Sequence, residues 1–232
     1  MTSPRAVVFD AGNTLLFIDP RTLLPIFRDF GVFLDEEEFW TSELEARRLL
    51  TRMVGNGGTG TEPHIWREYF TTLFLESGIR EEDLSTVAER VMAVHRETHL
   101  WTWVSPSTPP ALQALKEQGY RLGVISNADG RIEGLLEQGG IRPFFEFVMD
   151  SALEGLEKPE PEIFLRAASR LELEPEEVLY VGDLYSVDVV GAREAGMAAV
   201  LLDPLNRLRH PVPRIPTVAE LPDYLHRVSS PA

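Results

Sequence analysis

The chain has 232 residues, of which 44% are hydrophobic and 25% charged, a composition that predicts one or two folded domains and excludes a disordered chain. It contains no cysteine, which excludes disulfides, zinc–thiolate sites and thiol nucleophiles. Its 22 basic and 37 acidic side chains give a formal net charge of −15, which disfavours nucleic-acid binding and requires any phosphate site to carry its own positive charge or metal. Apolar runs are too short for a signal peptide or a membrane-spanning helix, so we expect a soluble, cytoplasmic protein with no membrane partner.

The first predicted element is a short buried strand over 5–9, which ends at Asp10. From 17 to 103 apolar residues recur at helical spacing, so this stretch is predicted to be an insert of about four helices. The glycine-rich segment 55–60 is expected to be a loop, either reaching into a cleft to select substrate or lying idle at the surface.

Two pairs of residues stand out inside this insert. Asp35 and Glu38 have the spacing of a capping box and predict the start of a helix. His95 and His99 are four residues apart, and we expect them on a solvated helix face rather than as metal ligands.

After residue 105 the pattern changes to alternating helices and strands. Predicted helices cover 109–118, 130–138, 160–170 and 187–195, and predicted strands cover 121–125, 146–149, 178–181 and 198–202. Near-continuously apolar strands joined by helices predict an α/β fold with a doubly wound parallel sheet. Because the first strand belongs to the same sheet, we expect a core formed by 1–16 and 104–232 and a helical domain formed by 17–103. The tail from Pro204 is expected to wrap over the surface.

Polar residues follow several of these strands. Asp10 follows the first strand, and Ser126 and Asn127 follow the second. Asp183 follows the fourth strand, and Lys158 precedes the helix that leads into that strand. In parallel sheets ligands bind beyond the carboxyl ends of the strands, so we expect these positions to converge. Asp10 taken alone is consistent with a nucleophile, a metal ligand or a helix cap.

The acidic residues among them predict a cation. Asp10, Asp183 and Asp188 would repel one another unless a positive charge lay between them, and carboxylate oxygens suit a hard ion such as Mg²⁺. Lys158 is one of only two lysines, with Lys116, and is a candidate for the fixed cation that a phosphate site would need.

Together these segments resemble the haloacid dehalogenase-like hydrolase superfamily. The resemblance spans residues 5 to about 203 and is carried by four motifs in order, namely Phe9–Leu15, Val124–Asn127, Lys158–Phe164 and Val181–Ala192. It implies a Rossmann-like hydrolase core with a small α-helical cap formed by the insert. It also implies hydrolysis of a small phosphorylated metabolite, that is, a phosphatase that uses Mg²⁺.

The resemblance implies a role for each residue at the reacting end of the site. Asp10 would be the nucleophile that forms an aspartyl-phosphate. Asp10, Asp183 and the backbone carbonyl of Gly12 would hold Mg²⁺. Asp188 would orient Lys158 or a metal-bound water.

It likewise implies the residues that bind the phosphoryl group. Ser126 and Asn127 would bind the phosphoryl oxygens, Lys158 would neutralise charge on nucleophile and phosphate, and Thr14 would support the nucleophile loop. The resemblance implies nothing about the substrate's identity or the oligomeric state.

One residue departs from the family pattern. Family phosphatases carry a second Asp two positions after the nucleophile as general acid and base, and here that position is Gly12. The loss is expected to cost about 10²–10⁴ in rate, and a positive φ at Gly12 would strain any Asp introduced there.

Gly12 therefore keeps alternatives open. A non-catalytic relative would bind a ligand or protein partner through the same cleft. A 2-haloacid dehalogenase would also lack the second Asp, but Asp183 and Asp188 argue against a metal-free site. A phosphonate-cleaving enzyme is set aside because 17–103 contains no lysine.

Overall fold

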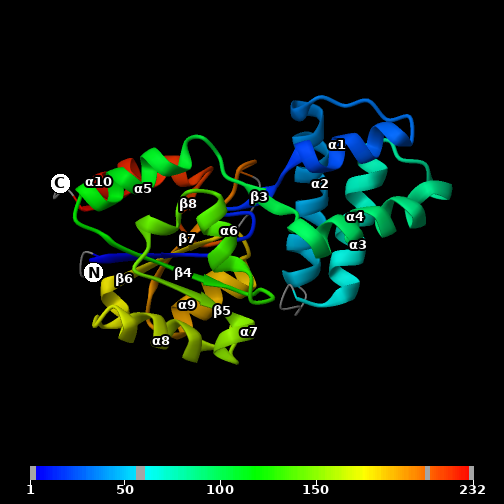
Figure 1. Ribbon diagram of the computed structural model, residues 1–232. Helices are drawn as coiled ribbons and strands as arrows, with labels where there is room; N and C mark the ends of the chain where they lie inside the picture. Colours follow the sequence, from blue (N-terminus) through cyan, green and yellow to red (C-terminus); the bar gives the residue numbers. More distant parts are fainter. Residues whose placement is uncertain (1–3, 56–60, 207–209, 230–232) are drawn as a thin grey trace. The chain divides into compact units, whose positions relative to one another are not determined.

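The computed structural model describes residues 4–55, 61–206 and 210–229. Contacts between residues divide the chain into two compact units. The first unit consists of Met1–Phe17 and Trp103–Ala232, and the second is Ile18–Thr102. Figure 1 shows the sheet in the first unit and the helices of the second.

A parallel sheet forms the centre of the first unit, as the sequence predicts. Within the described ranges it has six strands in the order β5-β4-β1-β6-β7-β8. Their bounds are β1 (Ala6–Phe9), β4 (Arg121–Ser126), β5 (Phe147–Asp150), β6 (Val178–Gly182), β7 (Ala198–Leu202) and β8 (Arg214–Ile215). Every residue of β1 and of β6 is buried, because helices cover both faces of the sheet.

The helices of the first unit lie on the two faces of this sheet. Figure 1 shows α5 and α10 on one face and α8 and α9 on the other. The α-helices are α5 (Thr108–Glu117), α6 (Ile132–Gln138), α7 (Ser151–Glu154), α8 (Pro161–Arg170), α9 (Val190–Glu194) and α10 (Leu221–Ser229). Short 3₁₀-helices are η2 (Arg142–Phe144), η3 (Pro175–Glu177) and η5 (Val218–Glu220), and η4 (Tyr185–Val189) is a π-helix. The predicted helix over 187–195 is thus a π-turn followed by α9.

The prediction for the tail was wrong. Instead of wrapping loosely over the surface, the tail adds β8 to the sheet and then forms α10, which packs against α5. Leu221 and Leu225 are fully buried, and their spacing of four residues is the helical signal that the Pro-rich stretch before them obscured.

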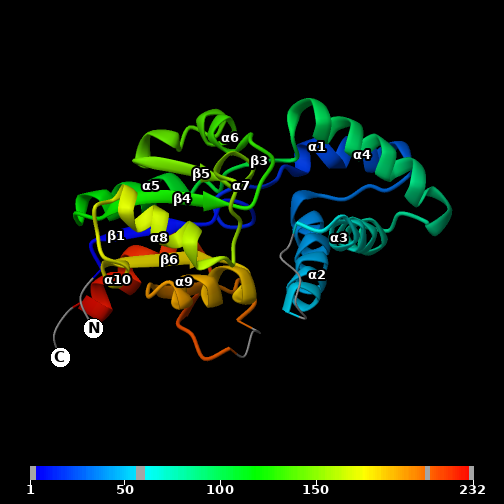
Figure 2. The ribbon, with the colours of Figure 1, turned by 90° about the horizontal axis from the view of Figure 1, so that it is seen from below.

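The second unit is built from helices. They are α1 (Pro20–Asp29), α2 (Glu36–Gly55), α3 (Pro63–Glu76), the 3₁₀-helix η1 (Glu81–Asp83) and α4 (Leu84–Thr98), and Figure 2 shows α1 to α4 from below. Phe27, Phe39 and Phe74 pack together at its centre, and the ring centroid of Phe27 lies 6.4 Å from that of Phe39 and 5.9 Å from that of Phe74.

The capping box predicted at the start of α2 is confirmed, because the Glu38 N–H donates to Asp35 Oδ1 and the Asp35 N–H donates to Glu38 Oε2, each at 2.9 Å. Most of the predicted loop, residues 56–60, lies outside the described residues.

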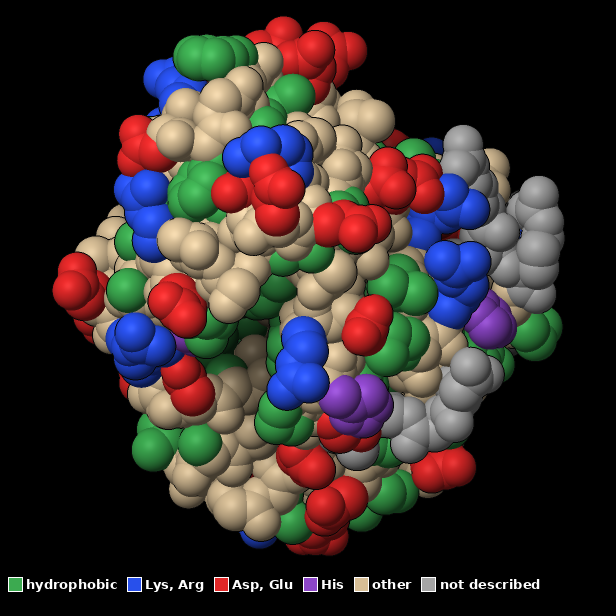
Figure 3. Space-filling model, turned by 90° about the vertical axis from the view of Figure 1, so that its right-hand side faces the viewer, with side chains coloured by type: hydrophobic (Ala, Val, Ile, Leu, Met, Phe, Trp, Pro, Cys, Tyr) green, Lys and Arg blue, Asp and Glu red, His purple; other side chains and the backbone are tan. Residues whose placement is uncertain are grey.

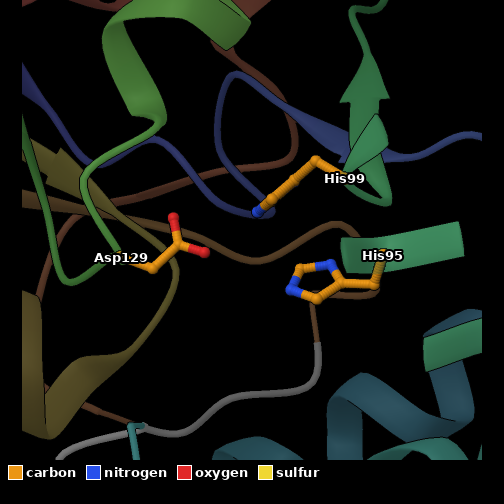
Figure 4. A group of neighbouring side chains, drawn as sticks. All are labelled: His95, His99 and Asp129. Atoms are coloured by element: carbon orange, nitrogen blue, oxygen red, sulfur yellow. The ribbon is translucent and has the colours of Figure 1, made fainter. Parts of the chain in front are cut away.

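Two short strands, β2 (Phe17–Ile18) and β3 (Trp101–Trp103), pair where the chain passes from one unit to the other. Next to β3, the rings of His95 and His99 lie side by side with centroids 4.5 Å apart (Figure 4). His99 is buried rather than solvated, contrary to expectation, and its Nδ1 accepts a hydrogen bond of 3.1 Å from the backbone N–H of Trp101. Its Nδ1 therefore carries no proton, and the pair belongs to the packing at the end of α4.

A buried ion pair within α2 is joined to α3 by a hydrogen bond inside the second unit. Glu43 and Arg47 are 1% and 7% exposed, and the Arg47 guanidinium binds both carboxylate oxygens of Glu43. The hydroxyl of Tyr69, on α3, donates to Glu43 Oε1 at 2.8 Å. We call these three residues the Glu43 cluster.

In the parts of the chain that the structure describes, no helix is long and apolar enough to cross a membrane. On the face that Figure 3 presents, acidic side chains lie among the Lys and Arg side chains rather than in one block.

Candidate active site

The candidate site lies where the sheet reverses its strand order. β1 lies between β4 and β6, and the chain extends the sheet first to one side and then to the other. Parallel pairing places the carboxyl ends of these three strands at one edge, where α/β proteins bind ligands. Asp10, Ser126 and Asp183 lie at these ends and are all buried.

Lys158 is buried at the centre of this edge. Its ammonium lies 2.7 Å from Asp10 Oδ1 and 2.7 Å from Asp188 Oδ1. Its side chain is 2% exposed, so the charge is supported by these contacts rather than by water. Lys158 thus links its own segment before α8 to the end of β1, through Asp10, and to η4, through Asp188.

We call Asp10, Lys158, Asp183 and Asp188 the core charge cluster. One oxygen from each of its three carboxylates lies within 4.8 Å of the others, and all three residues are buried. Three negative charges face one positive charge, which leaves a net charge of −2. Such a set fits a divalent cation held by oxygen ligands, because the cation offsets the excess charge.

The protonation of the cluster follows from its burial. Burial raises the pKa of Asp10 from 3.8 to about 6, although the Lys158 ammonium acts in the opposite direction. Burial by itself lowers the pKa of Lys158, but the nearby carboxylates of Asp10 and Asp188 outweigh it and raise this pKa well above its ordinary value. Lys158 is therefore charged at neutral pH, and Asp10, with a pKa of about 6, gains its proton as the pH falls just below neutral.

The side chain of Asn127 engages the backbone of Lys158. Its amide N–H donates to the Lys158 carbonyl and its Oδ1 accepts from the Lys158 N–H, both at 2.8 Å. These contacts differ from the expected phosphoryl binding and leave one amide N–H for a ligand. They indicate that Asn127 first of all holds the Lys158 segment against the end of β4.

Two glycines in the last motif allow close approach of backbone and side chain. A Cβ at Gly182 would lie 2.4 Å from the Asp188 carboxyl carbon, and one at Gly191 would lie 2.7 Å from the carbonyl oxygen of Pro159. Asp188 itself lies in η4, where its Oδ2 accepts from the Leu184 N–H at 2.9 Å. The π-turn therefore aims this carboxylate back at Lys158.

The turn after β1 has room at Gly12. Its φ is not positive, contrary to the concern raised by the sequence, and an added Cβ would meet no atom within 4 Å. Asn13 takes the left-handed conformation instead, with φ 55°. Thr14 is buried in the same turn.

Two residues of the site escaped the sequence analysis. Tyr180 reads as an ordinary apolar residue of β6, yet its hydroxyl lies 3.0 Å from the Lys158 ammonium. Asp150 ends β5, and its Oδ2 accepts from the N–H groups of Gly130 and Ile132 at 2.9 and 3.3 Å, which fastens the loop after β4. A carboxylate at the end of β5 was a usable signal for Asp150, whereas only the fold reveals Tyr180.

Comparison with known proteins agrees with this arrangement. The family model of haloacid dehalogenase-like hydrolases matches residues 4–196. The chain is 37% identical over 204 residues to a glyceraldehyde 3-phosphate phosphatase of Methanopyrus kandleri, which covers 84% of this chain and 82% of the relative. It is 30% identical to haloacid dehalogenase-like hydrolase domain-containing protein 3 of Xenopus laevis, covering 87% and 85%.

The fold has counterparts among solved structures. The Bacillus subtilis protein YfnB superimposes with a TM-score of 0.69 at 22% identity, covering 97% of this chain and 99% of that one. Sheet order, strand-end carboxylates and a family match over nearly the whole chain lead to one conclusion: this chain is a hydrolase of the haloacid dehalogenase-like family.

Proposed function

We propose that this hydrolase is a Mg²⁺-dependent phosphatase that acts on a small phosphorylated molecule through an aspartyl-phosphate on Asp10. The observation that carries the proposal is the core charge cluster, with three buried carboxylates and one buried lysine at the strand ends. Relatives named glyceraldehyde 3-phosphate phosphatase, in Methanopyrus kandleri and Methanothermobacter thermautotrophicus, support the choice of a small phosphorylated substrate.

In the proposed reaction an oxygen of Asp10 attacks phosphorus in line with the leaving group. The P–O bond to the leaving group breaks, the leaving group departs with its electron pair, and an aspartyl-phosphate remains. Water then attacks this phosphorus, releasing inorganic phosphate and restoring the carboxylate. Lys158 keeps Asp10 ionised and correctly rotated through its 2.7 Å contact.

Asp10, Asp183 and the carbonyl of Gly12 would hold Mg²⁺ in this proposal. When bound, the ion supplies charge neutralisation for the cluster and the phosphoryl oxygens. Ser126 and the remaining N–H of Asn127 are proposed to donate to the phosphoryl group. The helical second unit is proposed to be the cap of this hydrolase.

Gly12 determines which substrates suit the site. Glycine supplies no proton, so the leaving group must depart without a general acid. We therefore propose that acyl phosphates and aryl phosphates are hydrolysed in preference to alkyl phosphate monoesters.

Gly12 also favours a second candidate, a ligand-binding relative without turnover. A metal-free 2-haloacid dehalogenase fits less well, because Asp183 and Asp188 would add two negative charges to a buried site that gains nothing from them.

The test combines metal binding with a substrate screen. Mg²⁺ at about a hundredfold excess over its Kd should stabilise the parent protein by about 2.7 kcal/mol, and Asp183→Asn should remove this shift. Asp29→Asn, at an exposed aspartate paired with Arg90, is the matched control and should keep it. If Asp183→Asn responds to Mg²⁺ as the parent does, the metal site is misplaced. If Mg²⁺ binds but no phosphoester or acyl phosphate is turned over, the hypothesis of a ligand-binding relative without turnover is favoured.

A further inference from the structure

We propose that Tyr180 is a positioning residue that holds the Lys158 ammonium against the nucleophile, so that Lys158 acts on Asp10 rather than on the substrate's phosphoryl group. The proposal rests on the phosphatase function proposed above. It assigns a catalytic purpose to a hydroxyl group that lies within an otherwise apolar strand.

The hydrogen-bond count of the ammonium is the first argument. An ammonium has three N–H donors and no acceptor. Three acceptors surround Lys158 Nζ, namely Asp10 Oδ1 at 2.7 Å, Asp188 Oδ1 at 2.7 Å and the Tyr180 hydroxyl at 3.0 Å. Each donor is thus directed at the protein, and a phosphoryl oxygen could gain one only by displacing an existing partner.

The hydroxyl of Tyr180 is itself fixed in place. It lies 3.3 Å from the carbonyl oxygen of Ile125, on β4, and 3.3 Å from Asp188 Oδ1, so its own proton has an acceptor while its lone pair faces Lys158. Its ring packs edge-on against Phe164 with centroids 5.0 Å apart. The acceptor is therefore carried by a strand and a packed core rather than by a loop.

Burial means that water cannot easily replace the contact between the Tyr180 hydroxyl and the Lys158 ammonium. Tyr180 is fully buried and Lys158 is 2% exposed, so little water can replace a lost partner. A phenylalanine would fill the same space, which means that the hydroxyl is needed only for its polar contacts. Without it the ammonium keeps two carboxylates but loses the contact that prevents it from turning away from Asp10.

The kinetic consequence separates positioning from substrate binding. Tyr180→Phe should slow the phosphorylation of Asp10, measured as the burst with nitrophenyl phosphate, about 10–100-fold, the value of one hydrogen bond to a charged group. The substrate Kd, obtained from the dependence of the burst rate on substrate concentration, should change less than about twofold, because the hydroxyl does not touch substrate. Tyr224→Phe, a hydroxyl deletion on α10, is the matched control and should leave both constants unchanged.

A second readout does not depend on any substrate. Because the chain has only two lysines, Lys116→Arg leaves Lys158 as the sole ¹⁵N-lysine signal in a labelled protein. Its Nζ protons should exchange slowly with water in Lys116→Arg and at least about tenfold faster in Lys116→Arg/Tyr180→Phe. Circular dichroism of both variants confirms that they remain folded.

The outcomes distinguish this proposal from the proposed function. Unchanged proton exchange in the Tyr180→Phe background overturns the positioning role, whether or not the protein is a phosphatase. A weaker substrate Kd with an unchanged maximal burst rate also overturns it, since Lys158 would then act on substrate. If the parent turns over no phosphate compound, the phosphatase proposal fails while faster exchange still supports the placement of the ammonium by Tyr180.

Discussion

The two units of this protein each bury a charged cluster that a tyrosine hydroxyl contacts, but the charges balance in only one of them. In the Glu43 cluster one carboxylate meets one guanidinium, and Tyr69 completes the carboxylate's hydrogen bonds. In the core charge cluster three carboxylates meet one ammonium. A balanced cluster is complete without any ligand, whereas an unbalanced one is complete only with a cation. Charge balance, rather than burial, therefore separates the structural cluster from the candidate active site.

The largest effect is expected when the negative charge is removed from the Glu43 cluster. Glu43→Gln leaves the Arg47 guanidinium buried with no counter-charge from Glu43 and should lower the free energy of unfolding of the second unit by about 3–5 kcal/mol. Tryptophan fluorescence measures this, because Trp40, Trp66 and Trp101 lie in that unit. Glu45→Gln removes an exposed partner of Arg48 on the same helix and should cost less than about 1 kcal/mol. Equal effects of the two substitutions would mean that the burial of Glu43 adds nothing.

Removal of the only cation from the core charge cluster should abolish function rather than fold. Lys158→Ala is expected to lower kcat by about 10²–10³ or more, measured with Mg²⁺ present so that the carboxylates stay neutralised. Lys158→Arg should fail as well, because a planar fork replaces a point charge between Asp10 and Asp188. Lys116→Ala, at the exposed lysine, is the control. Ordinary turnover by Lys158→Arg would show that charge alone suffices.

Gly12 offers a gain of function. Gly12→Asp should raise hydrolysis of alkyl phosphate monoesters about 10²-fold, because the new carboxyl can protonate the leaving group and then activate water. The structure favours this test, since the added Cβ meets no atom within 4 Å and φ is not positive. Gly12→Asn has the same size but no proton to give, and should not show the gain. If the parent already hydrolyses alkyl esters as fast as nitrophenyl phosphate, another group supplies the proton.

The smallest effect concerns the pH dependence of stability without metal. Because the pKa of folded Asp10 is about 6, above its ordinary 3.8, folding is favoured by the neutral form, and this stability is present below pH 3.8 and lost as pH rises through 6. Metal-free Asp10→Asn should therefore gain about 1–3 kcal/mol over the parent between pH 4 and pH 7. Urea unfolding in the presence of a chelator measures the difference. A constant difference across this range would show that Asp10 ionises freely.

The arrangement of strands and helices in the core was predictable because its signals are local. Each predicted strand is an apolar run ended by a turn residue, and the carboxyl ends of parallel strands must meet at one edge. The convergence of Asp10, Asp183 and Lys158 followed from that rule, and the expectation of a cation followed from the repulsion among the carboxylates. The tail was mispredicted because its prolines outweighed the helical spacing of Leu221 and Leu225.

The sequence by itself determined the order of the motifs, the excess of carboxylates over cations among them, and the presence of a glycine without a side chain at position 12. Only the tertiary structure decided which contacts these residues make. Lys158 meets Asp10 across 148 residues of chain, Asn127 across 31 and the Tyr180 hydroxyl across 22. A hydrogen bond forms only when the distance between donor and acceptor atoms falls within a range of a few tenths of an ångström. Such distances depend on how helices and strands pack, and they cannot be inferred from a pattern along the chain.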